Sequence, residues 1–289
     1  MALSQQLKDI IAAIPTDFAD PAADYRKVRA TMAPFHGHPV SAACTVTEVT
    51  YGGVRCGEYS LRDQPNNLLA FHCHGGALVS CPLDDYHFYG ELIAGQAGCR
   101  VVMPDYRLAP ENCFPAAHDD CFNAYRGLIE SGVDPATIVV MGESCGGSLA
   151  VALLVRARAE GLPMPLCFVS ITGWFDLSVS GPEFSERDPF LTATWVRQRG
   201  RDYTAGTIAL DDPRVSPSYA DLAGLPPMYL QIGQFDTVRE GAILLAERAL
   251  RAGVAVTMES WPGVVHGWHG LANAAVPEAI DAWRDIRSY

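Results

Sequence analysis

A serine inside a G-x-S-x-G pattern is the first candidate for chemistry. The segment GESCG at 142–146 follows an apolar run at 137–141 and precedes a helical stretch at 145–160. A serine on so sharp a strand-to-helix turn is held above the sheet edge, where its hydroxyl can attack a substrate. The pattern predicts covalent catalysis at Ser144, and its simpler alternative is a serine that caps the following helix.

A glycine-rich segment upstream has the composition needed to stabilise a negatively charged oxygen. HCHGGALVS at 72–80 follows the apolar run at 68–73. Glycine-rich backbone lets N–H groups turn toward a tetrahedral intermediate without obstruction by side chains. We expect the N–H groups of Gly75 and Gly76 to serve as such donors, together with the N–H of Cys145.

Two histidines in the same segment allow another interpretation. His72 and His74 have strand spacing on one face, as metal ligands can have. Because no third ligand lies nearby in the sequence, we expect no metal, and a plain glycine turn is the remaining alternative.

A serine nucleophile needs a base, and the base needs a partner that fixes its tautomer. Asp236 and His266 each lie just past an apolar run, downstream of the serine. His269 competes with His266 for the role of the base. Thr237 and Glu240 could instead form a capping box for the next helix. Asp236 would then only interact favourably with the dipole of that helix. The order serine, aspartate, histidine, each past a strand, favours the catalytic interpretation.

The elements that must position these residues alternate along the chain. Short continuous apolar runs separated by helical stretches indicate an α/β protein with a mostly parallel sheet covered on both faces. The expected strands are 68–73, 99–104, 137–141, 166–172, 227–232 and 254–260, and the expected helices are 84–97, 115–131, 145–160, 239–252 and 274–287.

The N-terminal part has a different pattern. Two helices are expected at 3–14 and 22–33, followed by a hairpin of strands at 44–51 and 54–60 that turns through the glycines between them. A polar segment near 181–212, with a helical stretch at 191–203, interrupts the alternation later in the chain. We expect one domain over residues 1–289.

The composition argues against nucleic acid and membranes as partners. The chain has 289 residues, with 21 Lys and Arg against 33 Asp and Glu, so its net charge is −12. An acidic chain without a basic run does not attract nucleic acid. The uncharged apolar stretch 161–175 is too short to span a bilayer, and no secretory signal is evident, so we expect a cytoplasmic protein without membrane insertion.

The cysteines are unusually numerous. There are nine of them, and none forms a C-x-x-C pair, which predicts free thiols rather than disulfides. Cys73 and Cys145 lie next to the predicted chemistry. We therefore expect bulky thiol reagents to inhibit the protein by blocking its pocket.

Several motifs together resemble the hormone-sensitive-lipase-like branch of the α/β-hydrolase esterases. The resemblance implies Ser144 as nucleophile, His266 as base, Asp236 as acid, and N–H donors at Gly75, Gly76 and Cys145. It also implies a small helical cap from about 1–40 and 181–212, and no cofactor. The motifs are HGGA at 74–77, DYRLAPE at 105–111, FPAA at 114–117, GESCGG at 142–147, SPSYADLAGLPP at 216–227 and PGVVHGW at 262–268.

The sequence departs from the family pattern near the expected pocket. Ala77 replaces the third glycine, a mild change unless its φ is positive. Leu78 replaces the usual aromatic residue, which we expect to widen the acyl pocket. Thr172-Gly173-Trp174 replaces the frequent Ser-Pro-Trp. We expect the substrate pocket to include Ala77, Leu78, Trp174 and Val238.

The DYRLAPE stretch is expected to support the fold. Asp105 and Arg107 would hydrogen-bond the oxyanion loop or each other. Pro115 with Asp119 and Asp120 suits the start of a helix.

The most direct functional interpretation is a serine carboxylesterase that acts on short to medium acyl esters through an acyl-enzyme. A lactone hydrolase is the main alternative, because Leu78 and a short cap suit compact or cyclic acyl groups. An amidase or formamidase would use the same residues, and a non-catalytic small-molecule receptor would be expected to lack the histidine. The expected partner is therefore a small ester or lactone, and the sequence leaves monomer or homodimer open.

Overall fold

Eight strands form one sheet. The computed structural model describes residues 3–35, 37–62, 66–180 and 188–289, and within them the strands are β1 (Cys44–Tyr51), β2 (Val54–Leu61), β3 (Leu69–Cys73), β4 (Arg100–Pro104), β5 (Ile138–Glu143), β6 (Cys167–Ile171), β7 (Met228–Gly233) and β8 (Val256–Trp261). Their order across the sheet is β1-β2-β4-β3-β5-β6-β7-β8. The strand β2 is antiparallel to β1 and β4, and every other neighbouring pair is parallel. The expected mostly parallel sheet is therefore confirmed.

The hairpin of β1 and β2 follows from two glycines. Gly52 and Gly53 have φ values of 55° and 81°, and Tyr51 pairs with Val54 across the turn. A two-residue hairpin turn with both φ values positive matches the twist of its strands, and glycine adopts it without steric cost. The hairpin predicted from the sequence is confirmed.

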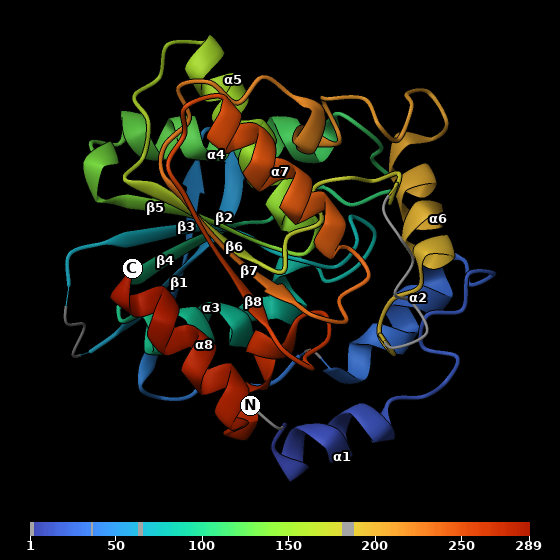
Figure 1. Cartoon of the computed structure of the whole chain (residues 1–289). Coiled ribbons are helices and arrows are strands. Elements are labelled where there is room, and N and C mark those ends of the chain that lie inside the picture. Colours follow the sequence, from blue (N-terminus) through green and yellow to red (C-terminus); the bar gives the residue numbers. More distant parts are fainter. Residues whose placement is uncertain (1–2, 36, 63–65, 181–187) are drawn as a thin grey trace.

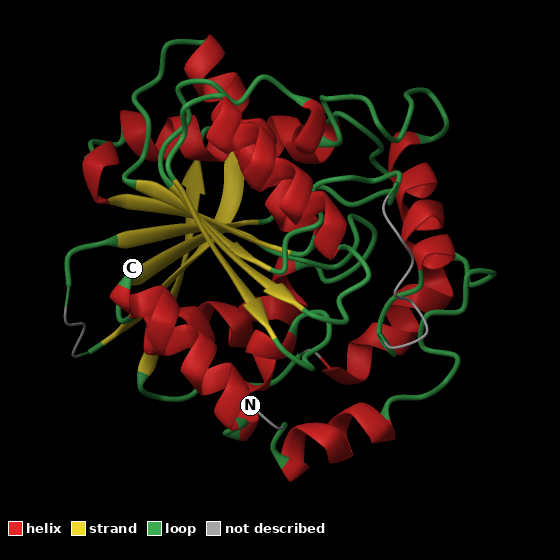
Figure 2. Ribbon diagram, in the orientation of Figure 1, coloured by secondary structure: helices red, strands yellow, loops and turns green. Residues whose placement is uncertain are grey.

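Helices cover both faces of the sheet (Figures 1 and 2). One face carries α3 (Leu83–Ala97) and α8 (Pro277–Ser288), and the other carries α4 (Ala116–Glu130), α5 (Cys145–Ala159) and α7 (Arg239–Arg251). The helix expected from residue 274 begins only at Pro277, because the chain before it forms the 3-10 helix η4 (Trp268–Ala274).

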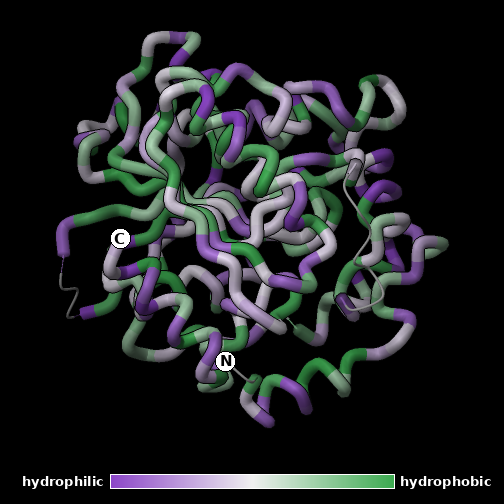
Figure 3. The backbone as a smooth tube through the Cα atoms, in the orientation of Figure 1, coloured by the Kyte–Doolittle hydropathy of each residue, from purple (hydrophilic) through white to green (hydrophobic). Residues whose placement is uncertain are grey.

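Each face of the sheet has its own core. Phe71, Phe122 and Phe168 are buried under α4, α5 and α7, whereas Met103 and Trp283 are buried on the face of α3 and α8. All five residues of β3 are buried, as expected for a strand covered from both sides. Figure 3 shows the hydrophobic stretches along the central strands and the hydrophilic ones mainly at the periphery.

The N-terminal helices lie beside the sheet domain. The first, α1 (Gln5–Ala13), is tied to α8 because the hydroxyl of Ser4 donates to Glu278 over 2.8 Å. The second, α2 (Tyr25–Met32), lies near α6 (Ala193–Thr204) in Figure 1. Residues 181–187 of the predicted insertion are outside the described residues.

A buried arginine joins α6 to the N-terminal segment that carries α1 and α2. Arg199 of α6 is only 1% exposed, and its guanidinium donates to the carbonyl of Ala23 over 2.9 Å. It also pairs with Asp202 at 2.9 Å. Phe18 and Phe190 add an edge-to-face contact with ring centroids 5.5 Å apart. Two segments far apart in the sequence thus pack against each other.

Removing the buried guanidinium tests this packing. Arg199→Ala is expected to lower the free energy of unfolding by about 2 kcal/mol, because a charge-assisted hydrogen bond and an ion pair are lost. Urea unfolding would measure the change. The control is Arg201→Ala on the exposed side of the same helix, which is expected to stay within about 0.5 kcal/mol of the wild type. Equal effects of the two substitutions would contradict the assigned role of Arg199.

Candidate active site

The turn between β5 and α5 holds Ser144 in a left-handed conformation, with φ 51° and ψ −125°. Such a conformation is strained for a residue with a side chain, and close packing of the turn maintains it. A Cβ at Gly146 would lie 1.9 Å from the carbonyl oxygen of Cys73, so only glycine fits there. Ser144 occupies the cap position of α5, but its side chain makes no cap hydrogen bond, so the capping alternative is wrong.

Three side chains from three strand ends meet at this turn. Ser144 Oγ lies 2.9 Å from His266 Nε2, and His266 Nδ1 lies 3.0 Å from Asp236 Oδ1. Asp236 follows β7, and its Oδ1 also accepts the N–H of Val238 over 3.0 Å. In this arrangement the hydroxyl can pass its proton to an imidazole whose other nitrogen is held by a carboxylate.

The competing interpretations of these segments do not match the structure. His269 Nε2 lies 2.7 Å from Gln231 Oε1 in the buried core, away from the serine. The hydroxyl of Thr237 donates to the carbonyl of Leu191 over 2.8 Å instead of capping a helix. Since α7 begins at Arg239 without a side-chain cap, the capping box is wrong.

A buried carboxyl group beside the acid could not be recognised in the sequence. Asp188 is 2% exposed, and it accepts the N–H groups of Thr237 and Phe190, each over 3.0 Å. Burial and the neighbouring charge of Asp236 raise the pKa of Asp188 to about 7. It comes from a polar segment without periodicity, so no sequence signal distinguished it from other acids nearby.

Three carboxyl groups determine the proton affinity of His266. Burial alone would lower the pKa of this imidazole, but the charge and hydrogen bond of Asp236, with smaller contributions from Asp188 and Glu143, raise it to about 9. The imidazole is therefore a stronger base than an ordinary histidine.

The glycine-rich loop after β3, in which we expect the oxyanion donors, is held by the residue before the serine. Glu143 Oε2 accepts the N–H of Gly75 over 3.3 Å and the hydroxyl of Tyr86 over 2.8 Å. The N–H of Gly75 is therefore already bonded to Glu143, which differs from the expectation that it donates to the negatively charged oxygen of the intermediate. Gly76 and Ala77 line the cavity next to Ser144.

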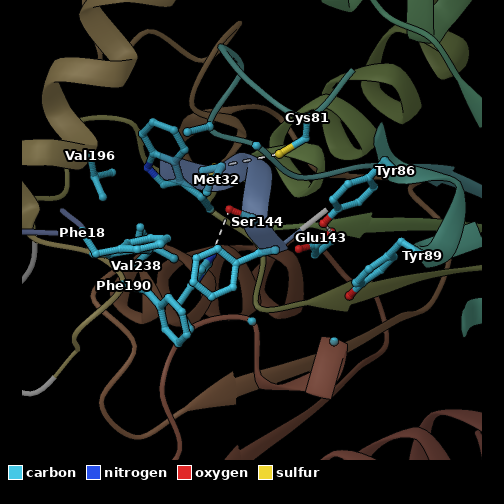
Figure 4. A pocket seen from close by; sticks show the side chains of 18 of the residues that line it. Phe18, Met32, Cys81, Tyr86, Tyr89, Glu143, Ser144, Phe190, Val196 and Val238 are labelled. Carbon is cyan, nitrogen blue, oxygen red and sulfur yellow. Dashed lines mark hydrogen bonds between the residues drawn. The ribbon is translucent and has the colours of Figure 1, made fainter. Parts of the chain in front are cut away.

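A cavity of about 200 Å³ opens at Ser144. Its wall is mostly aromatic and aliphatic, and Figure 4 shows Phe18, Phe190 and Val238 in it. The expected residues Ala77, Trp174 and Val238 all line this cavity. The N-terminal segment contributes Phe18, Met32 and Phe35, and the segment around α6 contributes Phe190, Leu191, Trp195 and Val196.

The described residues contain neither a metal-binding cluster nor a helix suited to a membrane. Among the residues that the structure describes, no three His, Cys, Asp or Glu side chains form a group that could hold a metal ion. Within the same residues, no helix combines the length and the apolar character needed to cross a membrane.

Comparison with known proteins identifies the family. Residues 70–270 match a family described as having the alpha/beta hydrolase fold. The chain belongs to this family. An acetyl-hydrolase of Streptomyces hygroscopicus is 36% identical over 239 residues, which cover 81% of this chain and 77% of the relative.

Other relatives of this α/β-hydrolase agree. An esterase of Acinetobacter venetianus is 30% identical over 254 residues, covering 87% of this chain and 83% of the relative. The crystal structure of an esterase from the bacterial hormone-sensitive lipase family superposes with a TM-score of 0.90 at 32% identity, covering 100% of this chain and 98% of that one. The expectation of an α/β-hydrolase esterase of the hormone-sensitive lipase type is confirmed.

Leu78 departs from its expected place in the hydrolase. It is buried in the core and is not among the residues that line the cavity. Its backbone has φ 67°, and its N–H contacts the sulfur of Cys145 at 3.2 Å, because the loop folds back over the start of α5. The expectation that Leu78 widens the pocket is therefore wrong.

The charged residues of the DYRLAPE stretch also have other partners. Asp105 pairs with Arg55 of β2 at 2.8 Å, and Arg107 pairs with Asp120 of α4 at 2.8 Å. These contacts correct the expectation of a bond to the oxyanion loop or between the two residues. They support the fold, as expected, by joining β2 and α4 to the end of β4.

The thiol groups near the serine are inaccessible. Cys73 and Cys145 have no exposed surface, and burial raises the pKa of Cys145 to about 12. The expectation that thiol reagents block the pocket through these two residues is wrong, because both thiols are buried beyond the reach of a bulky reagent. Cys81, which the sequence did not single out, lines the cavity instead.

The alanine in the oxyanion loop is strained. Ala77 has φ 54°, which is unfavourable for any residue with a Cβ. Ala77→Gly is expected to raise the free energy of unfolding by about 0.5–1 kcal/mol, since relief of strain exceeds the entropic cost of glycine. Urea unfolding would measure it.

The matched control for this substitution is in a regular helix. Ala152→Gly in the middle of α5 is expected to lower the free energy of unfolding by about 1 kcal/mol. The strain assigned to Ala77 would be refuted if both substitutions destabilised the protein to the same extent.

Proposed function

We propose that the protein hydrolyses carboxylic esters of short to medium acyl groups through an acyl-enzyme on Ser144. The chain of contacts from Ser144 to His266 at 2.9 Å and on to Asp236 at 3.0 Å carries the proposal. Ser144 Oγ attacks the ester carbonyl while His266 Nε2 takes its proton. The C–O bond to the alcohol then breaks, and His266 returns the proton to the leaving oxygen.

Water completes the cycle by the same route. It loses a proton to His266 as it attacks the acyl-enzyme, the bond to Ser144 breaks, and the proton returns to the serine oxygen. Asp236 keeps the imidazole in the tautomer that presents Nε2 to the serine. The released carboxylic acid and the regenerated hydroxyl balance the reaction.

We assign the oxyanion donors to the N–H groups of Gly76, Ala77 and Cys145. The first two line the cavity beside the serine, and the third begins α5, where helix N–H groups have no intrahelical acceptor. Glu143 positions this loop through Gly75. Loss of one such donor costs about 3 kcal/mol of barrier.

We assign the role of a cap to the N-terminal residues up to about 40 and to the described residues from 188 to 212. Aromatic side chains from both segments line the cavity above the serine. A wall of this kind excludes water and strengthens the electrostatic interactions inside. Its volume of about 200 Å³ supports short acyl groups.

Replacement of the nucleophile is the primary test. Ser144→Ala is expected to lower hydrolysis of p-nitrophenyl acetate and butyrate by about 10⁴-fold or more. Initial rates would be measured alongside Ser131→Ala, a serine at the end of α4 that is expected to keep wild-type activity. An organophosphate should add its mass to the wild type and not to Ser144→Ala. Unchanged turnover in Ser144→Ala would overturn the proposal.

The pKa of His266 leads to a second test. The base must be neutral, so kcat/KM for ethyl butyrate should rise with pH, reach half of its maximum near pH 9 and level off above that pH, as measured in a pH-stat. In Asp236→Asn the carboxylate that raises this pKa is absent. The rising limb should therefore move to lower pH while the plateau falls. A wild-type limb at or below the ordinary histidine pKa of about 6.5 would contradict this assignment.

A further inference from the structure

Oxygen-bearing side chains gather on one side of the cavity. Apart from Ser144, the described lining residues with a side-chain oxygen are Glu143, Tyr86 and Tyr89. Figure 4 shows these three on one side of Ser144, whereas Phe18, Val196, Phe190 and Val238 lie on the other. The cavity therefore has a polar arm and a predominantly apolar arm, with the serine between them.

One oxygen of the Glu143 carboxyl group is available to a ligand. Both hydrogen bonds to Glu143, from the N–H of Gly75 and from the hydroxyl of Tyr86, go to Oε2. Within the described part of the chain, Oε1 accepts no hydrogen bond. It is an acceptor at the wall of the cavity.

The hydroxyl of Tyr89 is also unsatisfied. Tyr89 is 3% exposed, and its hydroxyl has no hydrogen-bond partner among the described residues. Its ring is fixed by stacking on Tyr86, with centroids 5.1 Å apart, and on His72 at 5.6 Å. Buried polar groups are normally paired, so an orphan beside a substrate cavity indicates a group that pairs with a ligand. A phenol can both donate and accept.

We infer that Glu143 Oε1 and the hydroxyl of Tyr89 form a subsite for a hydroxyl group of the substrate. This inference rests on the proposed ester hydrolysis and specifies its substrate class as hydroxylated esters. The substrate hydroxyl donates to Glu143 and accepts from Tyr89, and the apolar part of the ester occupies the side of Phe18 and Phe190. A substrate without the hydroxyl leaves both protein groups unpaired, which is how such sites discriminate.

A neutral hydroxyl suits this arm better than an ammonium group. Burial raises the pKa of Glu143. The carboxyl group can accept a hydrogen bond from a hydroxyl in either protonation state, whereas an ammonium group would require its charged form, which burial disfavours.

Isosteric substrate pairs test the inference. We compare kcat/KM for 2-hydroxyethyl butyrate against propyl butyrate, and for ethyl 3-hydroxybutyrate against ethyl 3-methylbutyrate. These place a hydroxyl or a methyl group at the same point of the alcohol or of the acid. In at least one pair the hydroxyl ester should be about tenfold better, and the pair that shows this identifies the part of the ester bound in the polar arm.

The variant Tyr89→Phe removes only the orphan oxygen. It should reduce the hydroxyl advantage about fivefold or more without lowering the midpoint of urea unfolding, because the lost hydroxyl has no protein partner. The control Tyr125→Phe removes a hydroxyl from a buried tyrosine that does not line the cavity, and it should leave the ratio unchanged.

The outcomes distinguish failure of the subsite from failure of the proposed function. If both pairs have ratios near one, or if Tyr89→Phe keeps the wild-type ratio, while plain butyrate esters are hydrolysed, the subsite is overturned and the esterase proposal stands. If the folded wild type hydrolyses none of these esters, the proposed function fails and the subsite fails with it.

Discussion

The left-handed backbone of Ser144 is the constraint on which the rest of the site depends. Its N–H donates to the carbonyl of Ile171 over 3.2 Å, and its own carbonyl accepts the N–H of Trp174 over 2.7 Å, so the end of β6 and the residues after it fix the turn from one side. On the other side, Gly146 packs against Cys73 at the end of β3. A conformation that costs about 1–3 kcal/mol is thus maintained by neighbours in the middle of a parallel sheet. Every other functional group is placed relative to this fixed point.

Acidic side chains gather around that turn, with one histidine between them. Glu143, Asp188 and Asp236 are all buried, and His266 is the cation-forming group that they share. Asp236 Oδ2 has no hydrogen-bond partner within the described residues, because the imidazole and the N–H of Val238 both bond to Oδ1. The three carboxyl groups raise the pKa of the imidazole and so favour its protonated form. Burial also raises the pKa values of Glu143 and Asp188. The cavity thereby combines a strong base with apolar walls.

Much of the fold and the triad candidates could be predicted because parallel strands end at one edge. Ser144, Asp236 and His266 each follow a strand, so separations of 122 and 30 residues close to hydrogen-bond distance. The contacts that were not predicted depend on the orientation of side chains and backbone, which a sequence does not reveal. The side chain of Glu143 points across to the loop after β3, the positive φ of Leu78 turns it into the core, and Asp105 meets Arg55 because β2 inserts beside β4.

The two segments that cover the cavity lie outside the strands of the sheet. The N-terminal one ends before β1, and the other lies between β6 and β7, yet Arg199 and the ring pair Phe18–Phe190 join them into one wall. Sequence change in these segments can therefore reshape the binding surface while the strand register and the serine turn stay intact. In this architecture, sequence change in the wall of the cavity and sequence change at the serine turn are therefore structurally independent of each other.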